Sequence, residues 1–366
     1  MLRIFDIKQG MLGLVAGTAL AGLVLAAPAK ADETVTLAHS SPLGVNFADV
    51  MFGMQLGFFK EEGIELNLIS LKGAPVTVPQ VANKAIEFAF AEPSYLMGAM
   101  DKGETLPVQY VYDYYRVTTN DFTVLADSPI QSIADFKGKT VGIGSLGWSG
   151  HMSMMRKALS NHDMDMDSDI NLVAIGIGPA AWEQLKSGAV DVAALYGSQS
   201  VQMERSGMDI RRIAYPDDIR SVFQLGLLAH QDTIRDKPEL IAKMGRAIAK
   251  STIACSSAWE ACARALWTFD PTSRPAADKE AEWIATGVAT LQENYKTASY
   301  FPNGDPVWGQ FPDKALDTFL GALHEGGIIK QADLPVTDLF TNDFVEKFND
   351  FDEAEVKARA AAHTGN

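Results

Sequence analysis

The chain has 366 residues and a mass of 39.6 kDa, more than one hydrophobic core usually holds, so we expect two domains. Hydrophobic residues make up 47% and charged residues 21%, a balance that excludes a disordered or collagen-like chain. Asp and Glu (46) outnumber Lys and Arg (31), so we expect no nucleic-acid partner, which would need concentrated basic residues.

Residues 1–31 have the pattern of a secretory signal peptide. Basic side chains precede an apolar run from Met11 to Ala27, and small residues stand at the −3 and −1 positions of a cleavage site after Ala31. The alternative is an uncleaved membrane anchor, but the run is shorter than the ~20 residues of a membrane span. No second apolar run of that length follows. We therefore expect cleavage after Ala31 and a soluble protein in the periplasm.

Short strands alternate with helices through the first two thirds of the remaining chain. The expected strands are 35–38, 64–68, 86–90, 108–115 and 122–126, and then 140–144, 172–177, 191–196, 210–214 and 223–229. This alternation favours parallel, doubly wound sheets, and two such series predict two α/β lobes. Lobe one would hold residues 32–125 and 230–366, and lobe two residues 126–222, with hinge segments near 125–126 and 223–229.

The chain after Asp236 has an almost entirely helical pattern, which predicts a helical C-terminal extension. Its first part, Lys237 to Phe269, is expected to be one helix carrying both Cys255 and Cys262. Export permits a disulfide. However, seven residues of helix rise ~10.5 Å, beyond the ~7 Å that separates the Cα atoms of bridged cysteines. We therefore expect two reduced core cysteines.

Ligands of open α/β sheets bind outside the carboxyl ends of the strands, so the loops after the strands are the candidate binding site. These loops share hydroxyl groups, glycines and helix starts, and they are Ser40–Ser41, Gly73–Ala74, Glu92–Ser94, Ser145–His151 and Tyr196–Ser198. Free N–H groups at a helix start and the close approach that glycine permits suit a carboxylate, a sulfonate or another polar group.

Charged and aromatic residues in or near these loops are further candidates, namely Glu92, Tyr95, Tyr112, Tyr114, Trp148, His151 and Tyr196. The aromatic rings make a flat or aromatic solute plausible, because ring faces stack. If Glu92 lines the site, it repels an anion and favours a solute with N–H donors. Each candidate also has a structural interpretation: the serines as helix caps, Gly73 as a turn, His151 as an ordinary polar residue and the aromatic rings as core.

Several sequence runs resemble one family of proteins. They are GFFKEEG within Met51–Ser94, DFKGKTVGIG at 135–144, LKSGAVDVAALYGS at 185–198 and LFTNDFVEKFNDFD at 339–352. Together they resemble the sulfonate, taurine, nitrate and thiamine-precursor (THI5/NMT1-like) solute-binding proteins of bacterial ABC importers. The resemblance implies a two-lobed periplasmic-binding-protein fold of type II, a small-molecule solute and a membrane permease as partners, no cofactor, and a monomer.

By position, the resemblance implies solute contacts from Ser41, Asn46, Gly73, Ser94, the Ser145–Ser149 turn and Tyr196. The chain departs from the family at Glu92, where many relatives have a small uncharged residue. This departure argues against a simple sulfonate assignment.

Two other functions were weighed against solute binding. A pyrimidine-related enzyme occurs in the THI5-like branch, but its Cys-rich run is missing here, as are an HExxH motif, a Walker loop and a correctly spaced nucleophile elbow. A soluble partner of a sensor receptor is the second alternative. We expect a binding protein and no enzyme, and no residue is assigned to catalysis or to a metal.

Overall fold

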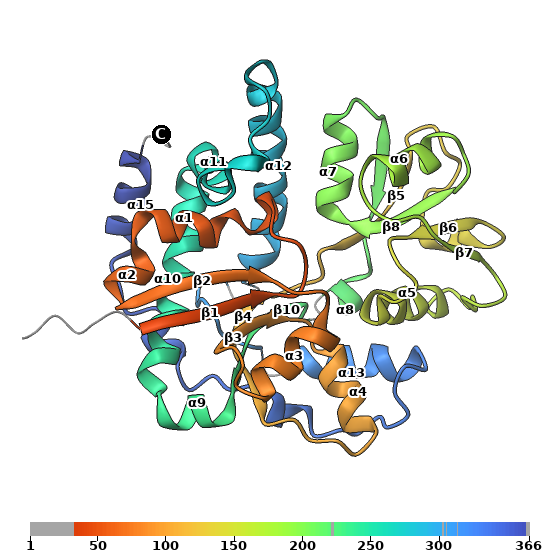
Figure 1. Ribbon diagram of the computed structural model, residues 1–366. Helices are drawn as coiled ribbons and strands as arrows, with labels where there is room; N and C mark the ends of the chain where they lie inside the picture. The colour runs from red at the N-terminus through yellow and green to blue at the C-terminus, as the bar shows by residue number, and fades with distance from the viewer. Residues whose placement is uncertain (1–32, 221–222, 302–303, 305, 313, 364–366) are drawn as a thin grey trace, which may run out of the picture. The chain divides into compact units, whose positions relative to one another are not determined.

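The computed structural model describes residues 33–220, 223–301, 304, 306–312 and 314–363 (Figure 1). The predicted signal peptide, residues 1–31, and its cleavage site lie outside the described residues. Among the helices that the structure describes, none combines the length and the apolar character that a membrane span needs.

The first sheet has five strands in the order β2-β1-β3-β10-β4. Their bounds are β1 Glu33–His39, β2 Ile64–Ser70, β3 Phe88–Ala91, β4 Val108–Tyr115 and β10 Leu225–His230. Strand β1 pairs in parallel with β2 and β3, while β10 runs antiparallel to β3 and β4. The edge strand β2 alternates buried and exposed residues, whereas every residue of the central strand β3 is buried. This difference is expected, because a central strand is covered on both faces of the sheet.

The second sheet also has five strands, in the order β7-β6-β8-β5-β9. Their bounds are β5 Asn120–Leu125, β6 Thr140–Ile143, β7 Asn171–Ala174, β8 Val192–Tyr196 and β9 Ile210–Ile213. Strand β6 is parallel to β7 and β8, and β5 runs antiparallel to β8 and β9. The predicted α/β class with parallel-rich sheets is therefore confirmed.

The pairing of β5 corrects one predicted boundary. Residues 120–125 were assigned to lobe one, with a hinge at 125–126, but they pair with β8 and β9 of the second sheet. The chain thus leaves the first sheet after Tyr115 and enters the second at Asn120. On the return, residues 225–229 of the other expected hinge lie within β10, every residue of which is buried in the first sheet.

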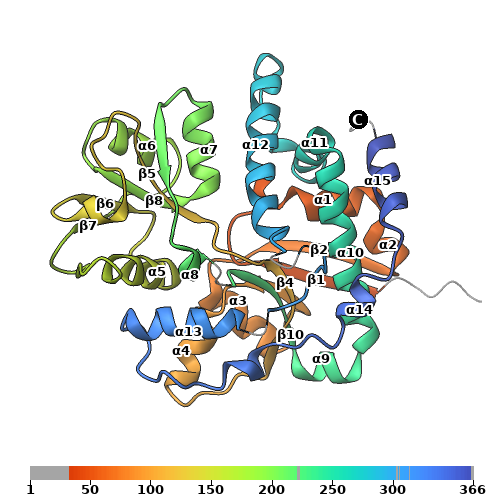
Figure 2. The same ribbon diagram turned by 180° about the vertical axis from the view of Figure 1, so that it is seen from behind.

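Helices connect the strands and form the C-terminal region, as predicted (Figure 2). They are α1 Ala48–Leu56, α2 Phe58–Glu61, α3 Ala74–Ala82, α4 Ser94–Asp101, α5 Ser149–Ser160, α6 Pro179–Lys186, α7 Gly197–Arg205, α8 Asp217–Arg220, α9 Gln231–Asp236, α10 Pro238–Ser257, α11 Trp259–Phe269, α12 Glu280–Ala298, α13 Ala315–Glu325, α14 Val345–Phe348 and α15 Glu353–Ala362.

Two large apolar clusters lie on opposite faces of the first sheet. Helices α1, α10 and α11 contribute to one cluster, while α3, α4 and α13 contribute to the other. The second cluster continues into residues of β5, β6, β8 and α5, so the apolar core is continuous from one sheet to the other. A third, small cluster packs α6 against β8.

The expected single helix from Lys237 to Phe269 is two helices, and the prediction of reduced cysteines is wrong. Helix α10 ends at Ser257 and α11 begins at Trp259, because Ala258 leaves the helical conformation with φ −150° and ψ 61°. This break brings the Cα atoms of Cys255 and Cys262 to 5.1 Å, and the two residues form a disulfide. The helical rise that argued against a bridge applies only to an unbroken helix.

Strand β4 contains two irregularities that decide where its tyrosines point. Its pairing with β10 shifts register between Leu227 and Leu228 and again between Leu225 and Gly226. An extra residue in a strand turns the following side chains to the opposite face. As a result Tyr110 joins the core cluster of α3 and α4, whereas Tyr112 joins the cluster of α1 and α10.

Candidate functional site

Polar and aromatic side chains from both sheets meet at the carboxyl ends of the strands. Glu92 follows β3 of the first sheet, while Trp148 and His151 lie at the start of α5 and Tyr196 ends β8 of the second. The Trp148 ring lies 4.8 Å from Tyr196 and 6.1 Å from His151, centroid to centroid. A Cβ atom added to Gly150 would lie 2.6 Å from Glu92 Oε2. The two sheets therefore present these groups to one another.

Glu92 is a carboxylate that forms no ion pair with the described basic residues. It directly follows β3, and the hydroxyl of Ser94 at the start of α4 donates a hydrogen bond to its Oε1. Burial raises the pKa of Glu92 and outweighs the hydrogen bond from Ser94, which acts in the opposite direction. The second oxygen, Oε2, faces Gly150. Glu92 is therefore a hydrogen-bond acceptor directed at the start of α5.

Four buried polar atoms have no hydrogen-bond partner among the described residues: both ring nitrogens of His151, Tyr215 Oη and, near Glu92, Tyr110 Oη. The rings of His151 and Tyr215 lie 6.2 Å apart. Glu92 acts electrostatically on Tyr110, whose pKa is raised first by burial and further by this carboxylate. Because unpaired buried polar atoms are costly, these atoms are candidates for contact with a bound molecule.

The imidazole of His151 is neutral at pH 7. Its side chain is buried, with 5% of the residue exposed, and burial lowers its pKa to about 3. A neutral imidazole has one N–H donor and one acceptor nitrogen. His151 can therefore recognise a solute group that both donates and accepts, but it does not supply a positive charge for an anion.

The loops after β1 and β2 are joined to one another. The N–H of Gly73, at φ +81°, donates to Ser40 O at 2.8 Å, and Ser41 Oγ lies 2.8 Å from His39 Nδ1. The backbone oxygen of Asn46 accepts hydrogen bonds from Tyr115 Oη at 3.1 Å and Asn294 Nδ2 at 3.2 Å. Ser41 and Asn46 thus lie in the segment after β1, and Gly73 lies in the loop after β2.

Three other predicted site residues, Tyr95, Tyr112 and Tyr114, pack in or against the apolar clusters. Tyr112 packs on Phe348 with ring centroids 5.3 Å apart, and Tyr114 donates to the Asp49 carboxylate at 2.8 Å. Both belong to the apolar cluster of α1 and α10. Tyr95 packs against the edge of the other cluster. The proposed site below therefore omits these three tyrosines.

The turn before α5 contains two predicted serines. Ser145 Oγ accepts the N–H of Gly147 at 3.1 Å, so it shapes the turn that carries Trp148. Ser149 is the first residue of α5, and its side chain lies outside the described part of the structure.

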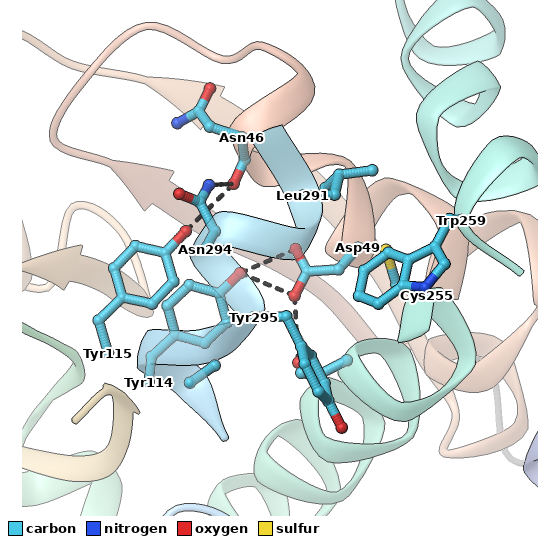
Figure 3. Close-up of a pocket in the computed structure, with 11 residues that line it drawn as sticks. Asn46, Asp49, Tyr114, Tyr115, Cys255, Trp259, Leu291, Asn294 and Tyr295 are labelled. Carbon is cyan, nitrogen blue, oxygen red and sulfur yellow. Dashed lines mark hydrogen bonds between the residues drawn. The ribbon is translucent and has the colours of Figure 1, made fainter. Parts of the chain in front are cut away.

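A small cavity lies in the first-sheet part of the molecule (Figure 3), and Glu92 is not among the residues that line it. Its volume of about 20 Å³ suits a water molecule and is far too small for an organic solute. Asp49 lines it and accepts hydrogen bonds from Tyr114 and, at 3.1 Å, from Thr252 Oγ1. Burial raises the pKa of Asp49. We interpret this hydrogen-bonded cavity as a structural element.

Sequence reasoning missed Tyr110 and Tyr215. Simple alternation puts Tyr110, Tyr112 and Tyr114 on one face of β4, and nothing in the sequence marks the register shift that separates them. Tyr215 follows β9 and could have been found, because the loop after this strand meets the same criterion as the five strand-end loops named from the sequence.

Two sheets of largely parallel strands, with polar groups meeting at their carboxyl ends, define a periplasmic-binding-protein fold. The family model described as NMT1/THI5 like matches residues 45–258, more than half of the chain, and the chain belongs to this family.

Two curated relatives are similar to parts of the chain. A putative thiamine biosynthesis protein of Haemophilus influenzae is 26% identical over 148 residues, 40% of this chain and 46% of the relative. The riboflavin-binding protein RibY of Chloroflexus aurantiacus is 27% identical over 217 residues, 59% of this chain and 60% of the relative. The chain thus matches about half to three fifths of the length of these relatives.

Solved structures share the fold over most of the chain. The putative sulfonate ABC transporter, periplasmic sulfonate-binding protein SsuA from Methylobacillus flagellatus KT, is 19% identical with a TM-score of 0.59, covering 87% of this chain and 94% of its own. The desulfurization enzyme DszB is 16% identical with a TM-score of 0.54, covering 86% of this chain and 98% of its own. At these identities the likeness concerns the fold alone.

Proposed function

We propose that this protein binds a small organic solute in the periplasm and delivers it to the membrane permease of an ABC importer. The observation that carries the proposal is the set of buried polar atoms on His151, Tyr110 and Tyr215 that lack a hydrogen-bond partner among the described residues, with Tyr110 near the Glu92 carboxylate. A solute bound among them would supply the missing hydrogen bonds.

The proposed solute is flat and carries N–H donors. Glu92 Oε2 provides an acceptor, while the Trp148 and Tyr196 rings provide aromatic surfaces for stacking. An aromatic or heterocyclic compound fits these groups better than an organic sulfonate or carboxylate. The arginine nearest to the end of β4, Arg116, is committed to the backbone oxygens of Tyr300 and Gln310 at 2.8 and 2.6 Å.

Binding is proposed to close two lobes about a hinge. The strand pairings support one lobe built on β1–β4 and β10 with the C-terminal helices, and a second built on β5–β9. The connecting segments 116–119 and 214–220 would carry the hinge movement, in place of the positions expected from the sequence. The closed protein, acting as a monomer, would then dock to the permease.

An enzymatic function is the alternative, since DszB shares the fold. We do not favour it, because neither cysteine of the chain is free to act as a nucleophile. Cys255 and Cys262 are joined to each other in a disulfide of the α10–α11 region. The periplasmic location also supports binding, and it rests on the predicted signal peptide.

Native mass spectrometry of freshly purified protein tests the proposal directly, since a co-purified small molecule would show its mass. Tryptophan fluorescence would then be titrated with aminopyrimidines, aromatic carboxylates and alkanesulfonates. We expect Glu92→Gln to weaken binding of the N–H-bearing compounds by roughly 10- to 100-fold, the effect of losing a hydrogen bond to a charged group. Asp343→Asn, on the exposed C-terminal segment, is the matched control. Equal affinity of wild type and Glu92→Gln for the bound compound would overturn the proposed site.

A further inference from the structure

Helix α12 contacts both sheets through two consecutive residues. Asn294 donates to the backbone oxygen of Asn46, in the loop after β1 of the first sheet. Its neighbour Glu293 forms an ion pair with Arg212, on β9 of the second sheet. Helix α12 also packs against α7 (Figure 1). One helix of the C-terminal region therefore connects a candidate binding loop of the first sheet to a strand of the second.

The ion pair is part of a balanced and partly buried group of charges. Arg212 Nε lies 2.5 Å from Asp121 Oδ2 on β5, while its Nη2 bonds Glu293. Lys296, one turn further along α12, lies 2.9 Å from the other oxygen of Glu293. The side chains are 28% exposed for Arg212, 16% for Glu293 and 8% for Asp121. Such a pair is less screened by solvent and salt than a surface pair.

The two carboxyl groups respond differently to Arg212. Burial raises the pKa of both, but at Glu293 the attraction of Arg212 and Lys296 is larger and the net pKa is lowered. At the more deeply buried Asp121 the effect of burial prevails and the pKa is raised. Glu293 is thus the carboxylate whose ionised form is stabilised by the contact between α12 and β9.

The first residue of α7, Gly197, packs directly against this ion pair. A Cβ atom added to Gly197 would lie 2.6 Å from Arg212 Nη2 and 2.9 Å from Glu293 Oε1. The N–H of Gly197 donates to Thr119 O, in the segment that connects the two sheets, at 2.6 Å. The residue before Gly197 is Tyr196, whose ring packs on Trp148 in the candidate site. The ion pair, the connecting segment and the Trp148 and Tyr196 rings of the candidate site are therefore neighbours.

We propose that Arg212 and Glu293 form a latch that holds the second sheet against α12 and thereby positions Tyr196 opposite the first-sheet loops. This inference rests on the proposed hinge movement. The pair joins α12 to β9 of the second sheet, so it can form only when these two elements are close. Breaking it should favour a more open arrangement without removing any group of the candidate site.

The test compares wild type with the isosteric variant Glu293→Gln, in the absence of any added solute. Small-angle scattering gives the radius of gyration, and hydrogen–deuterium exchange reports on α7 and α12. We expect Glu293→Gln to increase the radius of gyration and to speed exchange at 197–205 by about fivefold. The matched control is Asp167→Asn, which breaks the pair of Asp167 with Arg156 at 2.8 Å, outside the contact with α12, and should change neither quantity.

A double-mutant cycle tests whether Glu293 acts through Arg212. In an Arg212→Gln background, Glu293→Gln should have no further effect on exchange at α7. A second variant, Glu293→Met, keeps the length of the side chain and should open the protein in the same way if Glu293→Gln folds poorly. Unchanged scattering and exchange in the folded variants, or an equal effect with and without Arg212, would overturn the latch. None of these measurements requires a solute, so a failure of the proposed binding function would be recognised separately.

Discussion

Gly150 lies directly against the carboxylate of Glu92, so close that a Cβ atom at position 150 would be 2.6 Å from Glu92 Oε2. The same Cβ would lie 3.1 Å from Phe319 Cζ of α13. We predict that Gly150→Ala displaces the flexible carboxylate and weakens solute binding about tenfold, or ~1.4 kcal/mol. Stability should hold, because alanine suits a helix better than glycine. Fluorescence titration together with urea unfolding checks both parts, and unchanged affinity would contradict the role given to Glu92.

The raised pKa of Glu92 predicts opposite effects on stability and binding. Above its raised pKa, the folded protein carries an ionised carboxylate that burial disfavours. Glu92→Gln should therefore be more stable than wild type at pH 7, and this advantage should vanish as the pH falls toward the ordinary value of 4.5, where both side chains are neutral. Urea unfolding at pH 7 and 4.5 measures the difference. A variant that is less stable at pH 7 would show that Glu92 is a structural residue.

His151 predicts a specific loss of stability in acid. Its pKa falls from 6.5 to about 3 on burial, so the unfolded chain binds a proton below pH 6.5 that the folded protein does not accept. The neutral, buried imidazole therefore costs no stability above pH 6.5. As the pH falls from 6.5 toward 3, protonation of His151 in the unfolded chain lowers the free energy of unfolding. His151→Phe should remove that part of the acid sensitivity, which unfolding curves of both proteins at pH 7 and 4.5 would reveal. Equal pH dependence would mean that His151 is solvated.

Tyr110 and Tyr112 form a matched pair for testing the site. Tyr110 Oη is buried without a partner, whereas Tyr112 packs on Phe348 in the other apolar cluster. Tyr110→Phe should weaken solute binding about fivefold, or ~1 kcal/mol, because it removes one hydrogen bond to the solute. Tyr112→Phe should leave affinity unchanged. The reverse order of effects would move the site to the other face of the first sheet.

From the disulfide between Cys255 and Cys262 we predict a loss of stability when it is removed and the absence of free thiols when it is intact. Cys255 and Cys262, seven residues apart, close a short loop across the break between α10 and α11. Replacing both with serine should lower the free energy of unfolding by about 2 to 3 kcal/mol. A thiol assay on denatured, unreduced protein should detect no free thiol. Detection of two thiols in protein purified from the periplasm would contradict the bridge.

The sequence was sufficient to predict the alternation of strands and helices, the two series of strands and the helical C-terminal region. These features depend on local hydrophobic periodicity, which a single sequence displays directly. The same reasoning predicted Glu92, Trp148, His151 and Tyr196 as site residues, and the structure places them close together, because loops after parallel strands lie at the same edge of a sheet.

The errors arose where local pattern and tertiary pairing disagree. Nothing in the run Asn120–Leu125 shows that it pairs with β8 and β9, so the boundary between the sheets was misplaced. The helical pattern continues across Ala258, so the break that permits the disulfide was missed. The register shifts of β4 likewise depend on its pairing with β10, a strand more than 100 residues further along the chain.

The irregular pairing of β4 has a consequence for how solute preference can diverge among relatives of this protein. Where a strand is regular, preference changes by exchanging one side chain for another at a fixed position. Here an insertion or deletion of a single residue near Val111 would exchange which tyrosine faces the proposed site and which faces the opposite side of the sheet. Changes in the length of β4, more than its composition, are therefore the differences to compare when relatives are aligned.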